Sequence, residues 1–459
     1  MSQLLEKKAG SFVQAATPIR TEPLPREFPG VHGMDEEEVE AAVRVVRSKS
    51  LYRYYSLTPQ AEVNAFESEF AAHIGIRHAL AVTSGTGGLI TALAALGIGP
   101  GQEVIIPAYL WIAVAAAVVN VGAIPILADI DETFCIDPES VRACVTKRTT
   151  AVIAVHMNGG HVDISRLLEV TRTHKLFLIE DCAQCAGGTI GGRSVGTFGD
   201  IGVFSFQTNK NMTCGEAGCV VTNDEGLHQR AVAVHDAGYT RTADGLFSCD
   251  ETEVTTWGRG YRLDELRAAI LRVQLRKLPQ VISRMRSSKY RILQSLKTLP
   301  RVRPRKFIDP TGDTGGFLIT TYPDEKTARE TCASMRANGL ATVSPDTSNV
   351  VLADYGLHIY YNIASLVQKR GTDNRGAPWS LQENRSSKVS YQKGTNPVAD
   401  DLFSRSILLT IPSCLNQQDE DDIILGFHQA LAGSLVASRG SRQPILRSAQ
   451  QAVQQRRSI

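Results

Sequence analysis

The chain has 459 residues, of which 43% are hydrophobic and 21% are charged, which is typical of a globular protein too long for one compact core, so two domains are expected. The 49 basic and 47 acidic residues nearly cancel, and a global field that would attract nucleic acid or an anionic membrane is therefore excluded. Nine cysteines at irregular spacing favour a reducing cytoplasm over a disulfide framework.

The first part of the chain predicts an arm followed by two helices. Residues 1–33 are rich in proline and charge, have no apolar block typical of a secretory signal, and are expected to form an extended arm. Residues 34–48 and 60–74 carry apolar side chains at helical spacing. The apolar stretch 111–128 is interrupted by Gly122, so it predicts a helix and then a strand rather than a membrane span.

From residue 78 onward, apolar strands alternate with helices. Seven strands are predicted, at residues 79–82, 104–106, 124–130, 151–156, 176–180, 203–206 and 219–222. Helices are predicted between them, at residues 89–96, 113–121, 138–145 and 163–174. The strands are near-continuous apolar runs, which indicates burial on both faces. The pattern therefore predicts an α/β fold with a mostly parallel seven-stranded sheet flanked by helices.

The second half predicts a smaller domain. Residues 263–299 form a long helical pattern that would bridge two domains, and Pro279 is expected to kink or restart that helix. Shorter elements follow at residues 316–321, 325–337, 406–412 and 419–431. We therefore expect a large domain over 34–290 and a small α+β domain over 291–433. Within the small domain, 370–397 is poor in apolar residues and predicts a mobile insertion or lid, and 434–459 predicts a basic disordered tail.

Three polar features lie where predicted apolar elements begin or end. Lys210 and Asp181 each follow a predicted strand, and the small-residue turn 84–88 opens a predicted helix. Open α/β sheets bind ligands at the carboxyl ends of their strands. An amine, a carboxylate and a glycine-rich anion cradle are together the groups that hold pyridoxal phosphate.

Each group has a chemical role in such a site. The turn 84–88 would present backbone N–H groups to phosphate, and Ser205 would add a hydroxyl. Asp181 would keep the pyridine nitrogen protonated, so that the ring acts as an electron sink. Lys210 would bind the aldehyde covalently as a Schiff base and then move protons as general base and acid. Gln184 is placed to donate toward the phenolic oxygen.

Several of these features also have an ordinary alternative. The turn 84–88 lacks the Gly-Lys-Ser/Thr ending of a P-loop and the spacing of a dinucleotide fingerprint, and its glycines could serve only tight packing. Asp181 could be a helix cap or ion-pair partner, and Lys210 could be a solvated loop residue. Trp111, the candidate to cover one face of the ring, could be an ordinary core tryptophan.

The sequence predicts no metal site. Cys182 and Cys185 form a C-x-x-C pair, but no second pair lies at metal-ligand spacing. We therefore expect both thiols to serve as small apolar fillers rather than in zinc or redox chemistry.

Several ordered motifs resemble one known family. They lie at residues 84–86, 97–108, 129–131, 180–184, 199–200, 205–210, 215–218 and 261–265. By these motifs, over about residues 35–300 and more weakly over 400–432, the chain resembles the DegT/DnrJ/EryC1/StrS family. The resemblance implies a fold-type-I pyridoxal-phosphate transferase, a homodimer and a cytoplasmic enzyme.

The resemblance also implies residue roles. By this resemblance, Lys210 would form the Schiff base, Asp181 would contact the ring nitrogen and Gln184 would contact the phenolic oxygen. Trp111 would stack on the ring. The phosphate would be bound by Gly85, Thr86 and Ser205. The chain departs from the family at two positions. Gly260 stands where an asparagine commonly reaches the partner subunit's phosphate, and Leu110 stands where a threonine or serine is common.

The activity implied is an aminotransferase that moves an amino group from glutamate or glutamine to a ketone on a sugar or cyclitol. Such an enzyme would serve aminosugar, antibiotic or cell-surface sugar biosynthesis, with no nucleic acid or membrane as partner. Residues 205–207 resemble members that aminate cyclitols or free keto-sugars. The alternatives are a pyridoxal-phosphate dehydratase of the amino-hydroxybenzoate-synthase type, which keeps a lysine, and a non-catalytic regulatory or binding relative.

Overall fold

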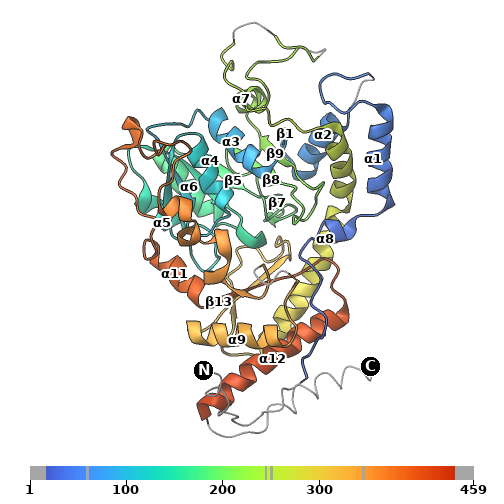
Figure 1. Cartoon of the computed structure of the whole chain (residues 1–459), viewed down its shortest axis with the longest axis vertical. Coiled ribbons are helices and arrows are strands. Elements are labelled where there is room, and N and C mark those ends of the chain that lie inside the picture. Colours follow the sequence, from blue (N-terminus) through green and yellow to red (C-terminus); the bar gives the residue numbers. More distant parts are fainter. Residues whose placement is uncertain (1–16, 58–60, 243–244, 249–251, 344–346, 440–459) are drawn as a thin grey trace, which may run out of the picture.

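Two sheets joined by one long helix organise the protein (Figure 1). The structure, a computed structural model, describes residues 17–57, 61–242, 245–248, 252–343 and 347–439. The linking helix, α8 (Glu265–Leu296), runs from the seven-stranded sheet to the four-stranded sheet below it in Figure 1. No helix within these ranges is both long and apolar enough to cross a bilayer.

The large sheet has the predicted composition. Its strands are β1 (His78–Val82), β2 (Glu103–Pro107), β3 (Ile124–Ala128), β4 (Thr149–Val155), β5 (Phe177–Asp181), β8 (Ile201–Ser205) and β9 (Gly218–Thr222). They lie in the order β1-β9-β8-β5-β4-β2-β3, with β9 antiparallel to both of its neighbours and the other pairs parallel. The prediction of a mostly parallel seven-stranded sheet is therefore confirmed.

Helices cover both faces of this sheet, because its strands carry apolar side chains on both sides. The helices that cover it are α2 (Glu62–Ile74), α3 (Gly85–Ala95), α4 (Ile112–Asn120), α5 (Pro138–Cys144), α6 (Ile164–His174) and α7 (Glu225–His235), and α1 (Glu36–Ser48) lies outside them. One apolar cluster joins the sheet to α3, α4, α5, α6 and α7. A second cluster joins its other face to α2 and the first half of α8, on which α1 packs in turn.

The second half of α8 packs on the small sheet. That sheet has the order β10-β11-β13-β12, formed by Arg303–Pro304, Phe317–Thr321, Ser406–Thr410 and Val350–Val351. Helices α9 (Glu325–Ala337) and α12 (Gln417–Arg439) complete its apolar core. Helix α12 continues past residue 433, where the sequence placed the end of the domain, and residues 440–459 of the predicted tail lie outside the described residues.

The sequence predicts a kink or a restart at Pro279, and the restart is wrong, because α8 is one helix of 32 residues with this proline inside it. Proline removes one backbone hydrogen bond and crowds the preceding turn. Here the ring is exposed. The helix is packed on both sides of it, by α1 and α2 before the proline and by α12 after it. Tertiary packing therefore holds the helix through a residue that disfavours it locally.

The segment between β12 and β13 leaves the small sheet and packs against the large one. It contains short helices, among them α10 (Ala364–Val367) and α11 (Pro397–Ser404). The amide of Gly101 donates to the side chain of Asn384 over 2.7 Å, and the hydroxyl of Tyr391 donates to the carbonyl of Pro125 over 2.7 Å. Since Pro125 lies on the edge strand β3, the predicted insertion 370–397 covers an exposed sheet edge.

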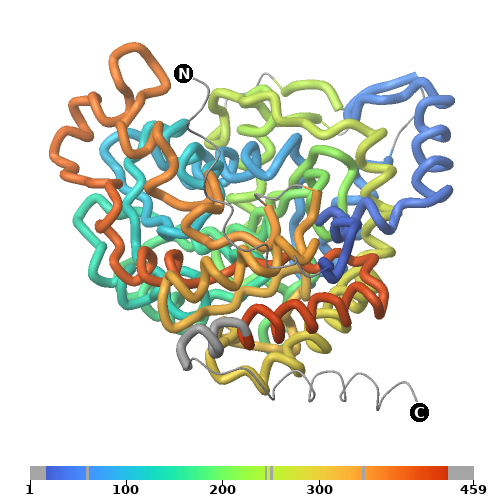
Figure 2. Tube along the Cα trace, turned by 60° about the horizontal axis from the view of Figure 1, so that its bottom comes forward, coloured from blue at the N-terminus to red at the C-terminus, as the bar shows by residue number. Residues whose placement is uncertain are grey.

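The N-terminal residues from 17 to 33 lie across the molecule and beside α12 (Figure 2). Arg20 forms ion pairs of 2.8 Å with both Asp419 and Asp422 on that helix. Further along, the amide of Gly30 donates to the carbonyl of Lys210 over 3.1 Å. The arm thus connects the small sheet to the loop that carries this lysine.

Candidate active site

A cavity of about 440 Å³ opens where the strands β4, β5 and β8 end. The seven residues singled out from the sequence all line it, namely Gly85, Thr86, Trp111, Asp181, Gln184, Ser205 and Lys210. They come from the first turn of α3, the residue before α4, the end of β5 and its following turn, the end of β8 and the next loop. The parallel sheet brings these distant segments to one edge, as strand polarity requires.

The first turn of α3 lines the cavity with Gly85 and Thr86. Ser84 caps the helix by accepting the amide of Gly87 over 3.0 Å, which leaves the first amides, those of Gly85 and Thr86, without an intrahelical partner. A Cβ atom added at Gly85 would lie 2.8 Å from the Cβ of Ser205. Glycine therefore allows this turn to lie directly against the Ser205 hydroxyl. The group fits a phosphate.

Asp181 is the last residue of β5 and is buried. Its carboxylate accepts the amide of Ala183 over 2.9 Å. Burial raises the pKa of Asp181, while the charges of Lys210 and His156 oppose that rise. A buried carboxylate of this kind is suited to face a cationic ring nitrogen, which would compensate its charge.

Lys210 lies in the turn after β8, where its amide donates to the carbonyl of Gln207 over 2.9 Å. Burial lowers the pKa of the Lys210 amine, although the charges of Asp181 and Glu216 oppose this. The amine is therefore neutral more often than a solvated lysine, and a neutral amine is the form that reacts with an aldehyde. The alternative of a solvated loop lysine does not describe this position.

Gln184 is held by a residue that the sequence did not single out. Its side-chain oxygen accepts the amide of Asn158 over 2.8 Å, so the amide nitrogen is the end that can donate into the cavity. Asn158 has left-handed backbone angles, φ 50° and ψ 45°. Arg305 donates to the carbonyls of Met157 and Asn158 over 3.0 and 3.1 Å and so secures this turn from the small-sheet side.

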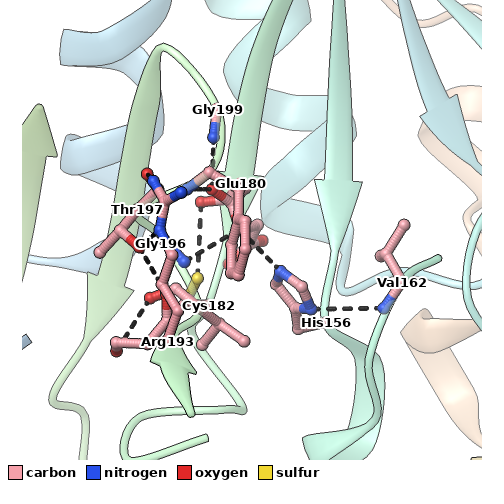
Figure 3. Close-up of polar contacts among 12 residues, drawn as sticks. His156, Val162, Glu180, Cys182, Arg193, Gly196, Thr197 and Gly199 are labelled. Atoms are coloured by element: carbon pink, nitrogen blue, oxygen red, sulfur yellow. Dashed lines mark hydrogen bonds and ion pairs between the residues drawn. The ribbon is translucent and has the colours of Figure 1, made fainter. Parts of the chain in front are cut away.

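Glu180, next to Asp181, has a different environment (Figure 3). Its carboxylate accepts the amides of Gly196, Phe198 and Gly199 over 2.7–2.9 Å and lies 3.1 Å from the ring nitrogen of His156. Burial opposes ionisation, but these bonds hold the pKa of Glu180 below its usual value. The group fastens the turn 196–199 to β5.

The ligand atoms of His156, Glu180 and Cys182 lie within 4.8 Å of one another, a grouping whose residue types could hold a metal ion. However, both oxygens of Glu180 already accept hydrogen bonds. Cys182 and Cys185 are free, and they are buried in the apolar cluster of Phe204 and Phe206. Their surroundings are those of apolar fillers.

The wall of the cavity opposite the strand ends comes from other segments. Trp111 is 43% exposed, and its ring lies 4.8 Å from that of His358, which stacks on Tyr355 at 3.9 Å. Burial, and next the charge of Lys210, lower the pKa of His358 to about 3, so this ring is neutral near pH 7. Glu27 of the arm and Thr410 of β13 also line this wall. Of these wall residues, the sequence singled out Trp111 alone. Glu27, Tyr355, His358 and Thr410 belong to no motif recognised in the sequence.

In a comparison with known proteins, residues 33–344 match the model of the DegT/DnrJ/EryC1/StrS aminotransferase family. The chain is 37% identical over 295 residues to a putative L-glutamine:3-amino-2,3-dideoxy-scyllo-inosose aminotransferase of Streptoalloteichus tenebrarius, covering 64% of this chain and 68% of that protein. It is 37% identical over 300 residues to the L-glutamine:2-deoxy-scyllo-inosose aminotransferase of the same organism, covering 64% and 69%. The Bacillus subtilis spore coat polysaccharide biosynthesis protein SpsC is 31% identical over 378 residues, covering 81% and 90%.

Two solved structures extend the likeness to the whole fold. The 3-amino-5-hydroxybenzoic acid synthase superposes with a TM-score of 0.69 at 27% identity, covering 90% of this chain and 100% of that one. DesV of S. venezuelae superposes with a TM-score of 0.70 at 28% identity, covering 89% and 99%. The likeness thus includes the small-sheet half of the chain, which extends beyond the family match.

Proposed function

Because this chain belongs to the DegT/DnrJ/EryC1/StrS aminotransferase family, we propose that it uses pyridoxal phosphate to transfer an amino group from glutamine to a keto-cyclitol or keto-sugar. One observation carries this proposal: the amine of a half-buried lysine, a buried carboxylate and a helix N-terminus share one cavity, at Lys210, Asp181 and Gly85. The family assignment makes the protein an aminotransferase, and the cavity supplies the residues for its cofactor.

The residues of the cavity fit the cofactor from end to end. The amides of Gly85 and Thr86 and the hydroxyl of Ser205 would hold its phosphate. Asp181 would face the ring nitrogen, and the amide nitrogen of Gln184 would donate to the phenolic oxygen. Trp111 lines the same cavity with an exposed ring that could cover one face of the cofactor.

When bound, pyridoxal phosphate supplies an aldehyde that carries the amino group between substrates and a ring that accepts electrons. Lys210 would hold that aldehyde while no substrate is present. Once a substrate amine takes this place, the Lys210 Nζ can remove a proton from one carbon and return it to another, and its lowered pKa suits both steps. Asp181 keeps a negative charge at the ring nitrogen during both half-reactions.

We propose glutamine as donor and a cyclitol as the first acceptor to test, since two relatives at 37% identity are named for those substrates. The enzymatic alternative is the amino-hydroxybenzoate-synthase type of dehydratase, and the likeness to the 3-amino-5-hydroxybenzoic acid synthase structure favours it. The identity to the aminotransferases is higher, 37% against 27%, which favours transamination.

We further propose a homodimer and a cytoplasmic location. The loop before α8 carries apolar side chains in solvent, with Trp257 89% and Leu246 59% exposed. Gly245 of this loop lies against the carbonyl of Tyr54, and the adjoining Leu57 is 80% exposed. Such a patch suits burial against a second copy. Eight cysteines within the described residues are free, as is usual in a reducing compartment.

The test is a spectroscopic one on the purified protein. We expect a yellow protein whose visible absorbance falls when glutamine is added and returns when 2-deoxy-scyllo-inosose follows, with the aminated product identified by mass spectrometry. A panel of keto-sugars then ranks the acceptors. A coloured protein that responds to no amino donor would favour the dehydratase, and a protein that cannot be loaded with the cofactor would contradict both enzymatic readings.

A further inference from the structure

The wall of the cavity that faces away from the strand ends contains two buried polar atoms with no hydrogen-bond partner in the described part of the chain. They are the Oε2 of Glu27 and the Oγ1 of Thr410. Both residues line the cavity of Lys210. Buried polar groups are nearly always paired, so unpaired atoms in a ligand cavity indicate a ligand that pairs with them.

The surrounding contacts hold both side chains in position. The hydroxyl of Thr347 donates to the other oxygen of Glu27, Oε1, over 2.5 Å, which leaves Oε2 as the available acceptor. The carboxylate is close enough to Tyr355 that its charge, after burial, helps to raise the pKa of that phenol. Thr410 is 1% exposed and lies on β13, where its amide donates to the hydroxyl of Ser348 over 3.1 Å.

A line of rings connects this wall to the cofactor end. Tyr355, beside Glu27, stacks on His358, which lies against Trp111. Carboxylate and hydroxyl groups around ring surfaces suit a molecule with several hydroxyl groups on a compact carbon ring. The carboxylate accepts from hydroxyls, and the threonine can donate or accept. Glutamine carries its own carboxylate, which the negative charge of Glu27 does not attract.

We propose that Glu27 and Thr410 bind ring hydroxyl groups of the amino acceptor and so select a polyhydroxylated cyclic ketone over a simple one. This inference rests on the proposed aminotransferase function. Glu27 and Thr410 come from the N-terminal arm and the small sheet, whereas the cofactor residues come from the large sheet. Acceptor selection is thereby separated in the structure from cofactor binding.

The test compares three single variants of the full-length holoenzyme with the wild type. Glu27→Gln keeps the shape and the Thr347 contact but replaces the accepting Oε2 by an N–H donor. Thr410→Val removes the hydroxyl at nearly constant volume. Glu22→Gln is the matched control, because Glu22 is an exposed acid on the same arm.

Three quantities are measured for each variant. The rate of the absorbance change with glutamine reports the donor half-reaction. The concentration of 2-deoxy-scyllo-inosose that half-saturates its reaction with the pyridoxamine-phosphate form reports the acceptor half-reaction. Calorimetry with myo-inositol, which has the ring hydroxyls but no ketone, reports binding without turnover.

We expect Glu27→Gln to raise the acceptor constant and the myo-inositol Kd by about ten- to a hundredfold, and Thr410→Val by about three- to tenfold. The donor rate should change less than about twofold in both, which also shows that the variants are folded, and Glu22→Gln should match the wild type. Equal losses in both half-reactions, or an unchanged or undetectable myo-inositol affinity, would overturn the proposal. A wild type that binds myo-inositol through Glu27 but does not react with glutamine would instead contradict the proposed function.

Discussion

The two ends of the cavity are built in different ways. At the proposed cofactor end, Asp181 and Ser205 are the last residues of buried strands, Gly85 begins a helix, and Lys210 lies in the turn after β8. At the other end, Glu27 comes from the arm and Thr410 from the small sheet. Polar positions at the cofactor end are fixed by the packing of one sheet. Positions at the other end depend on how the arm, the small sheet and the large sheet pack against one another.

This difference suggests a division of labour. A rigid sheet edge suits chemistry, because catalytic groups need positions held within a fraction of an ångström. Segments added around it can change their side chains without disturbing the sheet, which suits substrate choice. The variants below test whether the two ends are as separate as their construction indicates, and whether residues within the cofactor end divide into chemical and structural ones.

The largest effect is expected at Lys210. Lys210→Ala removes the amine that would hold the aldehyde and move the proton, so turnover should fall by about ten-thousandfold. The absorbance response to glutamine is the measurement. Lys326→Ala, at an exposed position on α9, is the matched control and should behave as the wild type. If the Lys210→Ala protein still transaminated at a tenth of the normal rate, the reaction would not depend on this end of the cavity.

Asp181→Asn is expected to rank second. The substitution keeps the shape but removes the charge facing the ring nitrogen, and both half-reactions should slow by about a thousandfold. Stability should not fall, since burial already raises the pKa of this carboxyl and thus disfavours its charged form. Stopped-flow absorbance and urea unfolding measure the two quantities. A large loss of stability without a loss of rate would make this residue structural.

For Glu180, the residue before Asp181, we expect the opposite result: a loss of stability without a large loss of rate. Glu180→Gln leaves a buried amide group facing three backbone N–H donors, which should lower the free energy of unfolding by about 3 kcal/mol. The folded fraction should keep its transamination rate within a few fold. Urea unfolding is the measurement, and Glu169→Gln at an exposed position on α6 is the control. A selective loss of rate would show that Glu180 belongs to the chemistry.

A smaller effect is expected where the two ends are joined. Arg305 donates from two nitrogens to the carbonyls of Met157 and Asn158, and lysine cannot reproduce this fork. Arg305→Lys should loosen the turn that holds Gln184 and slow the donor half-reaction by about tenfold. Arg303→Lys, at an exposed position close by, is the control. Equal rates for both variants would show that Gln184 does not depend on the small-sheet side.

The smallest effect is expected in the pH dependence of the free energy of unfolding. The folded pKa of His358 is about 3, below the usual 6.5, so between these values the unfolded chain binds a proton that the folded chain does not. Its contribution to the free energy of unfolding therefore falls as the pH decreases from 6.5 toward 3. His358→Phe should flatten this part of the curve obtained from urea unfolding, while His174→Gln on the surface should not. An unchanged slope would show that His358 is solvated at the wall of the cavity.

Local pattern was enough for much of the fold and for one end of the site. The apolar runs predicted all seven strands of the large sheet, and the turn, carboxylate and lysine at their ends predicted residues that line one cavity. Both predictions, of the strands and of the cavity residues, succeed because they depend on short segments and on strand polarity. The restart at Pro279 was predicted from local propensity, and the packing of α1, α2 and α12 on α8 overrides it.

What the sequence by itself determined is the alternation of strands and helices, a lysine and a carboxylate that line one cavity, and the resemblance that led to the family. Only the tertiary structure decided which residues close the cavity. Glu27 and Thr410 are hundreds of positions apart and line the same cavity because the arm and the small sheet lie at the same edge of the large sheet. Contacts between distant segments leave no spacing in the sequence, since they depend on the packing of whole elements rather than on the period of any one of them.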